Sequence, residues 1–219
     1  MAKIKWDQEG KRLYETGVSN GVLYVHSGAS YKNGVAWNGL ISVTESPSGA
    51  EATPIYADNI KYLSLTSAEE FAASIEAYTY PDEFAECDGS AELAAGVMIG
   101  QQKRKKFALV YKTIIGNDTE NEAHGYKLHI IYGCQAAPSE RAYTTVNDSP
   151  EAITFSWEIS TTPVEVTDHK PTSILTLDST KVDATKMKKV EDKLFGDDST
   201  GQPTLLTPDE VLAIVNAAE

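Results

Sequence analysis

The sequence predicts a mainly β protein, a sandwich or barrel with one short helical segment and a C-terminal helical appendage. Three observations predict this: alternating apolar runs, turn residues between them, and few stretches of helical spacing. The clearest run covers residues 153–160, where Ile153, Phe155, Trp157 and Ile159 alternate with polar residues. A period of two places these four side chains on one face of a half-buried strand.

Other strand candidates share short length and enrichment in β-branched and aromatic residues. They are 22–25, 34–45, 60–65, 71–80, 107–115, 126–134, 164–166 and 174–177. Asn, Gly, Asp and Pro residues lie between many of them and favour turns. Many short strands separated in this way are typical of a sandwich or barrel.

Helical signals are few and lie mostly near the end of the chain. Residues 81–86 are expected to form one or two turns, and residues 182–194 show near-helical apolar spacing before Gly196. Thr207 and Glu210 have the spacing of a capping box at the start of another short helix. We therefore divide the chain into a β domain with an N-terminal arm, residues 1–177, and a C-terminal extension with two short helices, residues 178–219.

Charge is distributed unevenly along the chain, whose net charge is −13. Residues 45–93 hold eleven acids and one lysine, a local charge of −10, whereas residues 101–112 hold five bases and no acid. An acidic protein repels phosphate, so tight binding of nucleic acid is disfavoured. Acidity that only keeps the protein soluble is an interpretation with equal standing.

The cysteines and the lengths of the apolar runs indicate in which compartment the protein folds. Cys87 and Cys134 show no zinc-ligand spacing, so we interpret them as small core residues in a reducing compartment. Residues 1–7 contain no apolar run, so no signal peptide is expected there. No stretch reaches the ~20 apolar residues of a membrane helix.

Catalytic patterns are weak, and we expect no enzyme, no metal site and no cofactor. The four histidines, His26, His124, His129 and His169, show no paired ligand spacing. The acids of residues 82–88 lack the glycine and the closing glutamate of a calcium loop, so a solvated acidic loop is the simpler interpretation. No nucleophile elbow, phosphate-binding loop or dinucleotide motif occurs.

Two features suggest contacts between subunits. The basic run of Lys103, Arg104, Lys105 and Lys106 fits a solvated hairpin flank or a contact with an acidic neighbour. Trp6 lies in a polar leader, where it either covers its own domain or docks on a neighbouring subunit.

Longer segments resemble a known family. Residues 6–24, 34–40, 56–62, 75–84 and 147–158 are similar to segments of the major tail proteins, or tail-tube proteins, of long-tailed bacteriophages (Siphoviridae), particularly phages of Gram-positive bacteria. The resemblance covers residues 6–170, about three quarters of the chain. It implies a β-sandwich or partial barrel with a flanking helix.

The resemblance also implies a function in the virion tail, with assembly in the host cytoplasm. Such subunits form hexameric rings whose sheets join into a continuous lumen, and the rings stack around a tape-measure protein. A tail terminator protein is a further partner, and DNA later passes through the lumen during ejection without specific binding. On this basis we expect acids of the −10 block to line the lumen and the basic run and Trp6 to contact neighbours. The expected lumen residues are Glu45, Glu51, Asp58, Glu69, Glu70 and Glu76.

Two other functions stay open. A carbohydrate- or protein-binding β-sandwich module of a virion could use exposed tyrosines such as Tyr78 and Tyr80. A hydrolase on a β scaffold is disfavoured by the missing catalytic patterns. A tube subunit should form rings or polymers, whereas a binding module stays small and an enzyme shows turnover.

Overall fold

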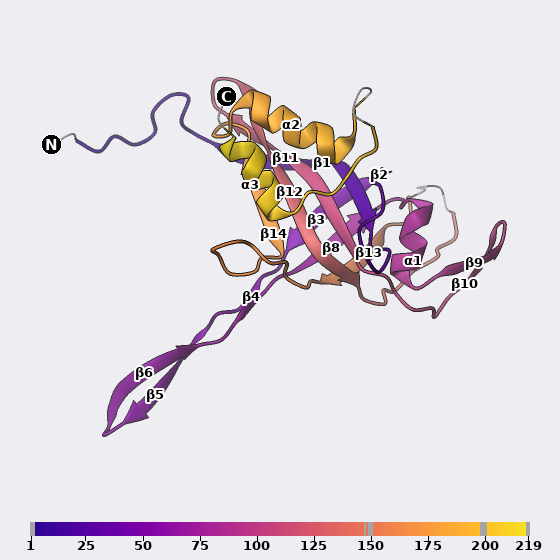
Figure 1. Ribbon diagram of the computed structural model, residues 1–219, viewed down its shortest axis with the longest axis horizontal. Helices are drawn as coiled ribbons and strands as arrows, with labels where there is room; N and C mark the ends of the chain where they lie inside the picture. Colours follow the sequence, from indigo (N-terminus) through magenta and orange to yellow (C-terminus); the bar gives the residue numbers. More distant parts are fainter. Residues whose placement is uncertain (1–2, 147, 149–150, 198–200, 218–219) are drawn as a thin grey trace.

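Two antiparallel β layers pack face to face, and two helices cover the outer face of the larger layer (Figure 1). The computed structural model describes residues 3–146, 148, 151–197 and 201–217. Eight strands are connected by pairing: seven follow the order β2-β1-β11-β12-β13-β8-β3, and β14 pairs with β12 off this path. They are β1 Tyr14–Val25, β2 Val35–Trp37, β3 Leu40–Glu45, β8 Ala72–Ala77, β11 Phe107–Asn117, β12 Asn121–Ala136, β13 Phe155–Ser160 and β14 Ile174–Asp178. The predicted mainly β fold is confirmed.

Strand β12 belongs to both layers. It pairs with β11 and β14 along most of its length, and at Gln135 and Ala136 it pairs with β13. The register with β11 shifts next to Gly133, which has a φ of +61°. A Cβ atom at this position would lie 2.2 Å from the carbonyl oxygen of Thr162, so the irregularity requires glycine.

Aromatic side chains fill the space between the two layers. Trp157 of β13 is fully buried, and its ring centroid lies 5.0 Å from that of Phe84, 5.5 Å from that of Tyr80 and 5.8 Å from that of Trp37. Edge-to-face packing of this kind adds to the stabilisation from burial. Trp157 and Ile159 lie on the inner face of β13, as the alternation predicts, although the strand begins at Phe155.

The C-terminal helices form a third layer. Helix α2, Ala184–Phe195, begins at Asp183, whose side chain accepts backbone N–H groups, and α3, Pro208–Asn216, begins with the predicted capping box at Thr207. Their apolar faces share one cluster with the larger sheet, and Tyr132 Oη donates to the carbonyl of Leu206 at 2.9 Å. The C-terminal extension therefore packs on the sheet, and its division from the β domain at residue 178 stays a prediction.

Shorter elements complete the fold. The predicted turns at 81–86 are a 3₁₀ helix, Asp82–Phe84, followed by α1, Ala85–Asp88. The predicted strand at 164–166 is wrong, because Val164 makes only an isolated bridge to Thr172. The two cysteines are free and buried, as expected for core residues, and burial raises the pKa of the Cys87 thiol to about 12.

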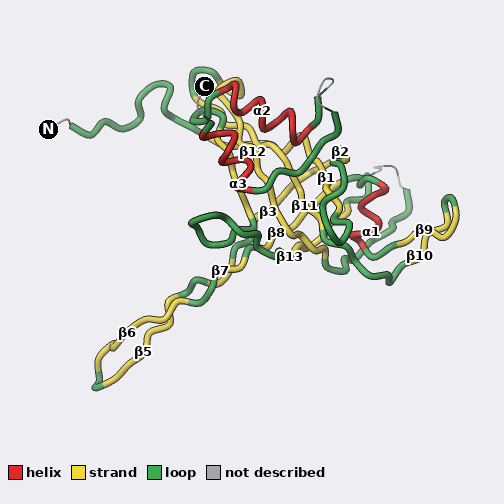
Figure 2. The backbone as a smooth tube through the Cα atoms, viewed as in Figure 1, coloured by secondary structure: helices red, strands yellow, loops and turns green. Residues whose placement is uncertain are grey.

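Three segments project from this body (Figure 2). The hairpin arm, residues 46–71, continues β3 and β8 outward through two small strand pairs. These are β4 Ser48–Gly49 with β7 Glu69–Glu70, and β5 Ala52–Ala57 with β6 Ile60–Thr66. A second hairpin pairs β9, Ala91–Ala94, with β10, Val97–Ile99. The N-terminal arm, residues 3–13, extends away from the side opposite to this second hairpin (Figure 1).

Candidate assembly surfaces

The hairpin arm exposes apolar side chains on both of its faces. Every residue of β5 and β6 is exposed, including large apolar ones. These are Ile55, Tyr56, Ile60, Tyr62, Leu63 and Leu65, with exposed fractions of 39–68%. The sequence predicts a strand at 60–65, and β6 forms there, but it is covered on neither face. An isolated two-stranded ribbon is marginally stable, and exposed apolar surface of this kind is typical of association sites.

The six acids expected to line a lumen are not brought together. Four of them, Glu51, Asp58, Glu69 and Glu70, lie exposed on the hairpin arm. Glu76 lies on the outer face of β8 and accepts a hydrogen bond from Ser42 Oγ at 3.0 Å. Glu45 instead turns inward, where it accepts a hydrogen bond from Tyr111 Oη at 2.7 Å. Their role in a lumen stays a prediction.

The outer face of the smaller layer is polar and built from small side chains. The inward residues of β3, β8 and β13 are apolar except for Glu45, and the alternate positions carry Ser, Thr and Glu together with Ala72. The polar outward residues are Ser42, Thr44, Ser74, Glu76, Ser156, Glu158 and Ser160. Sequence reasoning missed this face, although the polar half of the alternation at 153–160 already signals it. A surface with carboxylates and no lysine or arginine offers little attraction to phosphate.

The basic run is largely engaged within the same chain. Lys105 Nζ pairs with Glu86 at 2.5 Å, and Lys106 Nζ donates to Thr162 Oγ1 at 2.8 Å. Arg104 reaches Asp88 at 3.5 Å and the backbone carbonyl of Ala136 at 3.3 Å. Lys103 is exposed. The adjacent blocks of opposite charge thus partly neutralise each other inside one molecule, and a contact of the run with a neighbour stays a prediction.

Asp88 is a buried junction, so the interpretation of residues 82–88 as a solvated acidic loop is wrong for Asp88, whereas Asp82 and Glu83 are exposed as it expects. Its side chain is 8% exposed and pairs with both Arg104 and Arg141. Its Oδ1 atom also accepts the indole N–H of Trp157 at 3.1 Å. Arg141 in turn lies 5.4 Å from the ring centroid of Tyr80. Asp88 therefore ties α1, the segment before β11 and the loop after β12 to the aromatic core.

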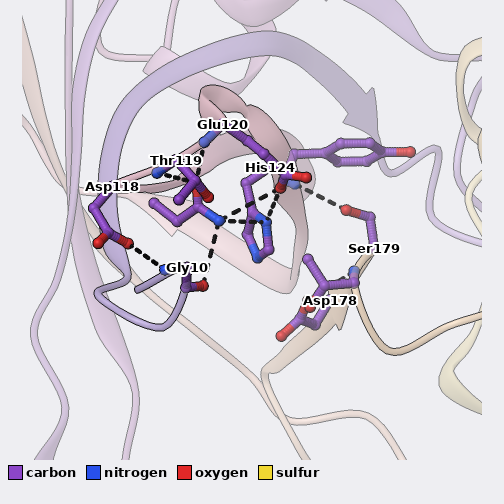
Figure 3. A network of polar contacts seen from close by, with 10 residues as sticks. Gly10, Asp118, Thr119, Glu120, His124, Asp178 and Ser179 are labelled. Carbon is purple, nitrogen blue, oxygen red and sulfur yellow. Dashed lines mark hydrogen bonds and ion pairs between the residues drawn. The ribbon is translucent and has the colours of Figure 1, made fainter. Parts of the chain in front are cut away.

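The root of the N-terminal arm is fixed by the turn between β11 and β12 (Figure 3). Asn117, which is 3% exposed, donates through Nδ2 to the carbonyl of Gly10 at 3.4 Å and contacts His124 Nδ1 at 3.1 Å. Asp118 accepts the backbone N–H of Gly10 at 3.0 Å and pairs with Arg12 at 3.5 Å. The arm is therefore held at Gly10 and Arg12.

The outer part of the N-terminal arm exposes its large apolar side chains to solvent. Ile4 is 69% exposed and Trp6 75%. Of the two interpretations left open for Trp6, the structure contradicts the first, since this side chain does not cover its own domain. Its contact with a neighbouring subunit stays a prediction.

A buried histidine lies behind the root of the hairpin arm. His129 is 8% exposed, stacks on Tyr111 with ring centroids 4.7 Å apart, and contacts Thr113 Oγ1 at 2.9 Å. Its Nδ1 atom lies 3.5 Å from Glu45, the last residue before the arm. Burial lowers the pKa of His129, and the charge of Glu45 opposes that shift without cancelling it.

We expect His129 to make the protein less stable in mild acid. Because the unfolded chain takes up a proton near pH 6.5 and the folded chain only at lower pH, stability is fully present above about pH 6.5 and falls below it. Urea unfolding from pH 8 to pH 5 should show a smaller decline for His129→Gln than for the wild type. The matched control is His169→Gln, an exposed histidine. Equal declines in wild type and His129→Gln would contradict this expectation.

Within residues 3–146, 148, 151–197 and 201–217, no three His, Cys, Asp or Glu side chains gather closely enough to hold a metal ion. None of the helices described there is long and apolar enough to span a membrane.

Comparisons with known proteins give matches among solved structures. No protein-family model matches the sequence, and no curated protein matches it. Among solved structures, a chain of the "Cryo-EM structure of the anti-feeding prophage (AFP) baseplate, 6-fold symmetrised" aligns with a TM-score of 0.40 and 8% sequence identity. The alignment covers 83% of this chain and 100% of that chain.

Proposed function

We propose that this protein is a structural subunit of a phage-tail-like particle that assembles with copies of itself, and that it is not an enzyme. The observation that carries the proposal is the hairpin arm, whose β5 and β6 strands expose apolar side chains on both faces. A monomer gains nothing from such a projection, whereas a second copy can bury both faces. The resemblance of residues 6–170 to tail-tube proteins supports the same function.

Open strand edges give a route to assembly. Strand β3 pairs only with β8, and β14 pairs only with β12, so each leaves one side of its backbone unpaired among the described residues. Exposed edges of this kind accept a strand from another chain, and closure into a ring satisfies them all. We infer that the copies join sheet to sheet in a hexameric ring and that rings stack into a tail tube.

The polar outer face of β3, β8 and β13 suits the wall of such a tube. Its Ser, Thr and Glu side chains make few contacts with phosphate, so DNA can pass without binding. In this proposal Glu76 faces the lumen and Glu45 does not. A tape-measure protein inside the tube, a tail terminator at its end and a place in the virion tail belong to the same proposal.

Size and shape measurements test the proposed function. We expect purified protein to form rings or hollow filaments as its concentration rises, visible by negative-stain microscopy and as a rising mass in sedimentation. A protein that stays monomeric up to high concentration and binds an oligosaccharide or a peptide would instead favour the ligand-binding module. Turnover of a substrate would refute the proposal that the protein is not an enzyme.

A further inference from the structure

We propose that the N-terminal arm of one copy docks into the pocket beside the β9–β10 hairpin of a second copy, with Trp6 as its anchor. This inference rests on the proposed function, because it names the surface of the neighbouring subunit that receives the arm. Both partner surfaces belong to this chain, and each is incomplete in the monomer.

The arm is an apolar anchor with a basic flank. In an extended chain, alternate side chains share a side, so Ile4 and Trp6 project together while Lys3 and Lys5 project on the other side. Tryptophan is among the residues that most often dominate binding at interfaces. Arg12 Nη2 donates to the carbonyl of Asp7 at 2.9 Å, so Trp6 is the first residue beyond the part of the arm that is held. Its side chain is 75% exposed and stands clear of its own subunit.

The receiving pocket lies between α1 and the β9–β10 hairpin and has a volume of about 610 Å³. That volume is within the range of about 300–1,000 Å³ that is typical of binding pockets. Its wall includes apolar surface from Tyr80 and from Met98, which is 51% exposed. Leu93 and Val97 of the same hairpin are 67% and 52% exposed, so the hairpin, like the N-terminal arm, presents apolar side chains to solvent.

Charge at the pocket is complementary to the arm. Of the five carboxylates that line the pocket, Glu86 and Asp88 are neutralised by bases of the same chain. Asp82, Glu83 and Glu92 have no cationic partner among the described residues and leave the rim negative. Lys3 and Lys5 bring the opposite charge, which favours this partner and the correct register.

The positions of arm and pocket require two copies. The N-terminal arm and the β9–β10 hairpin extend from opposite sides of the molecule (Figure 1). The arm cannot fold back onto its own pocket, because its root is held at Gly10 and Arg12. A contact between two different surfaces repeats from copy to copy and generates a ring or a filament.

Tryptophan fluorescence tests the docking in the intact protein. Trp37 and Trp157 are 2% and 0% exposed, so the signal that acrylamide can quench comes from Trp6. We expect assembly of the wild type to remove most of this quenching. Trp6→Phe, the control, should show weak quenching before and after mixing to high concentration. Assemblies in which Trp6 stays as accessible as in the monomer overturn the docking.

A charge exchange tests the partner surface. We expect Lys5→Glu and Glu83→Lys each to raise the protein concentration needed for assembly about tenfold, because each places like charges together. The double variant should assemble at a concentration close to that of the wild type. Glu122→Lys, which changes an exposed acid of β12, should leave the concentration needed for assembly nearly unchanged. All three positions are exposed, so we expect folding to be preserved, and urea unfolding of each monomeric variant checks this.

The two proposals fail in different ways. A wild-type chain that never assembles contradicts both the proposed function and the docking. A wild type that assembles, with a double variant no better than either single variant, overturns the docking alone and leaves the structural function in place.

Discussion

Replacing Asp88 by alanine is expected to lower the free energy of unfolding by about 3 kcal/mol, since removing one partner of a buried ion pair leaves the other uncompensated. The side chain is 8% exposed and balances Arg104 and Arg141, and it accepts the indole N–H of Trp157. Its loss leaves two guanidinium groups without their carboxylate and one indole donor unpaired at the edge of the core. Urea unfolding of the monomer, followed by fluorescence, measures the change.

Two variants show whether the effect comes from the charge or from the position. Asp88→Asn keeps an oxygen for the indole N–H of Trp157 and removes only the charge, so we expect a smaller loss of stability. Glu122→Ala removes an exposed acid and should change stability by no more than about 0.5 kcal/mol. If Asp88→Ala unfolds at the urea concentration of the wild type, Asp88 is not the junction described above.

The role of Asp88 was beyond sequence reasoning for a simple reason. Its partners Arg104, Arg141 and Trp157 lie 16, 53 and 69 residues further along the chain. A local pattern of acids gives no information on which distant segments approach it, so a solvated loop was the natural interpretation. Burial of a carboxylate depends on those partners and not on its sequence neighbours.

Strands with one apolar face were predictable, because alternation reports directly on a boundary between core and solvent. This holds for β13, where Trp157 and Ile159 are buried and Ser156 and Glu158 are exposed. The same reasoning fails for β6, which carries apolar residues on both faces. Such a pattern predicts that a strand forms but not what covers it.

Serine in place of the four most exposed apolar residues of the hairpin arm is expected to prevent assembly while the monomer keeps its stability. These residues are Tyr56, Ile60, Tyr62 and Leu65, which are 58–68% exposed. Because they contact mostly solvent in the monomer, their replacement should change its free energy of unfolding by about 0.5 kcal/mol or less. In the assembly each large apolar side chain that becomes buried contributes about 1.5–3 kcal/mol, so losing four removes most of the driving force.

The matched control replaces Tyr143 and Val146 by serine, since these are 72% and 83% exposed but lie outside the arm. Sedimentation and negative-stain microscopy of the two variants beside the wild type then separate a specific surface from general surface hydrophobicity. Loss of rings or filaments in both variants would mean that any exposed apolar residue supports association. Assembly of the arm variant at the wild-type concentration would mean that the arm is not an assembly surface. Only loss confined to the arm variant fits a subunit whose projecting hairpin is completed by another copy.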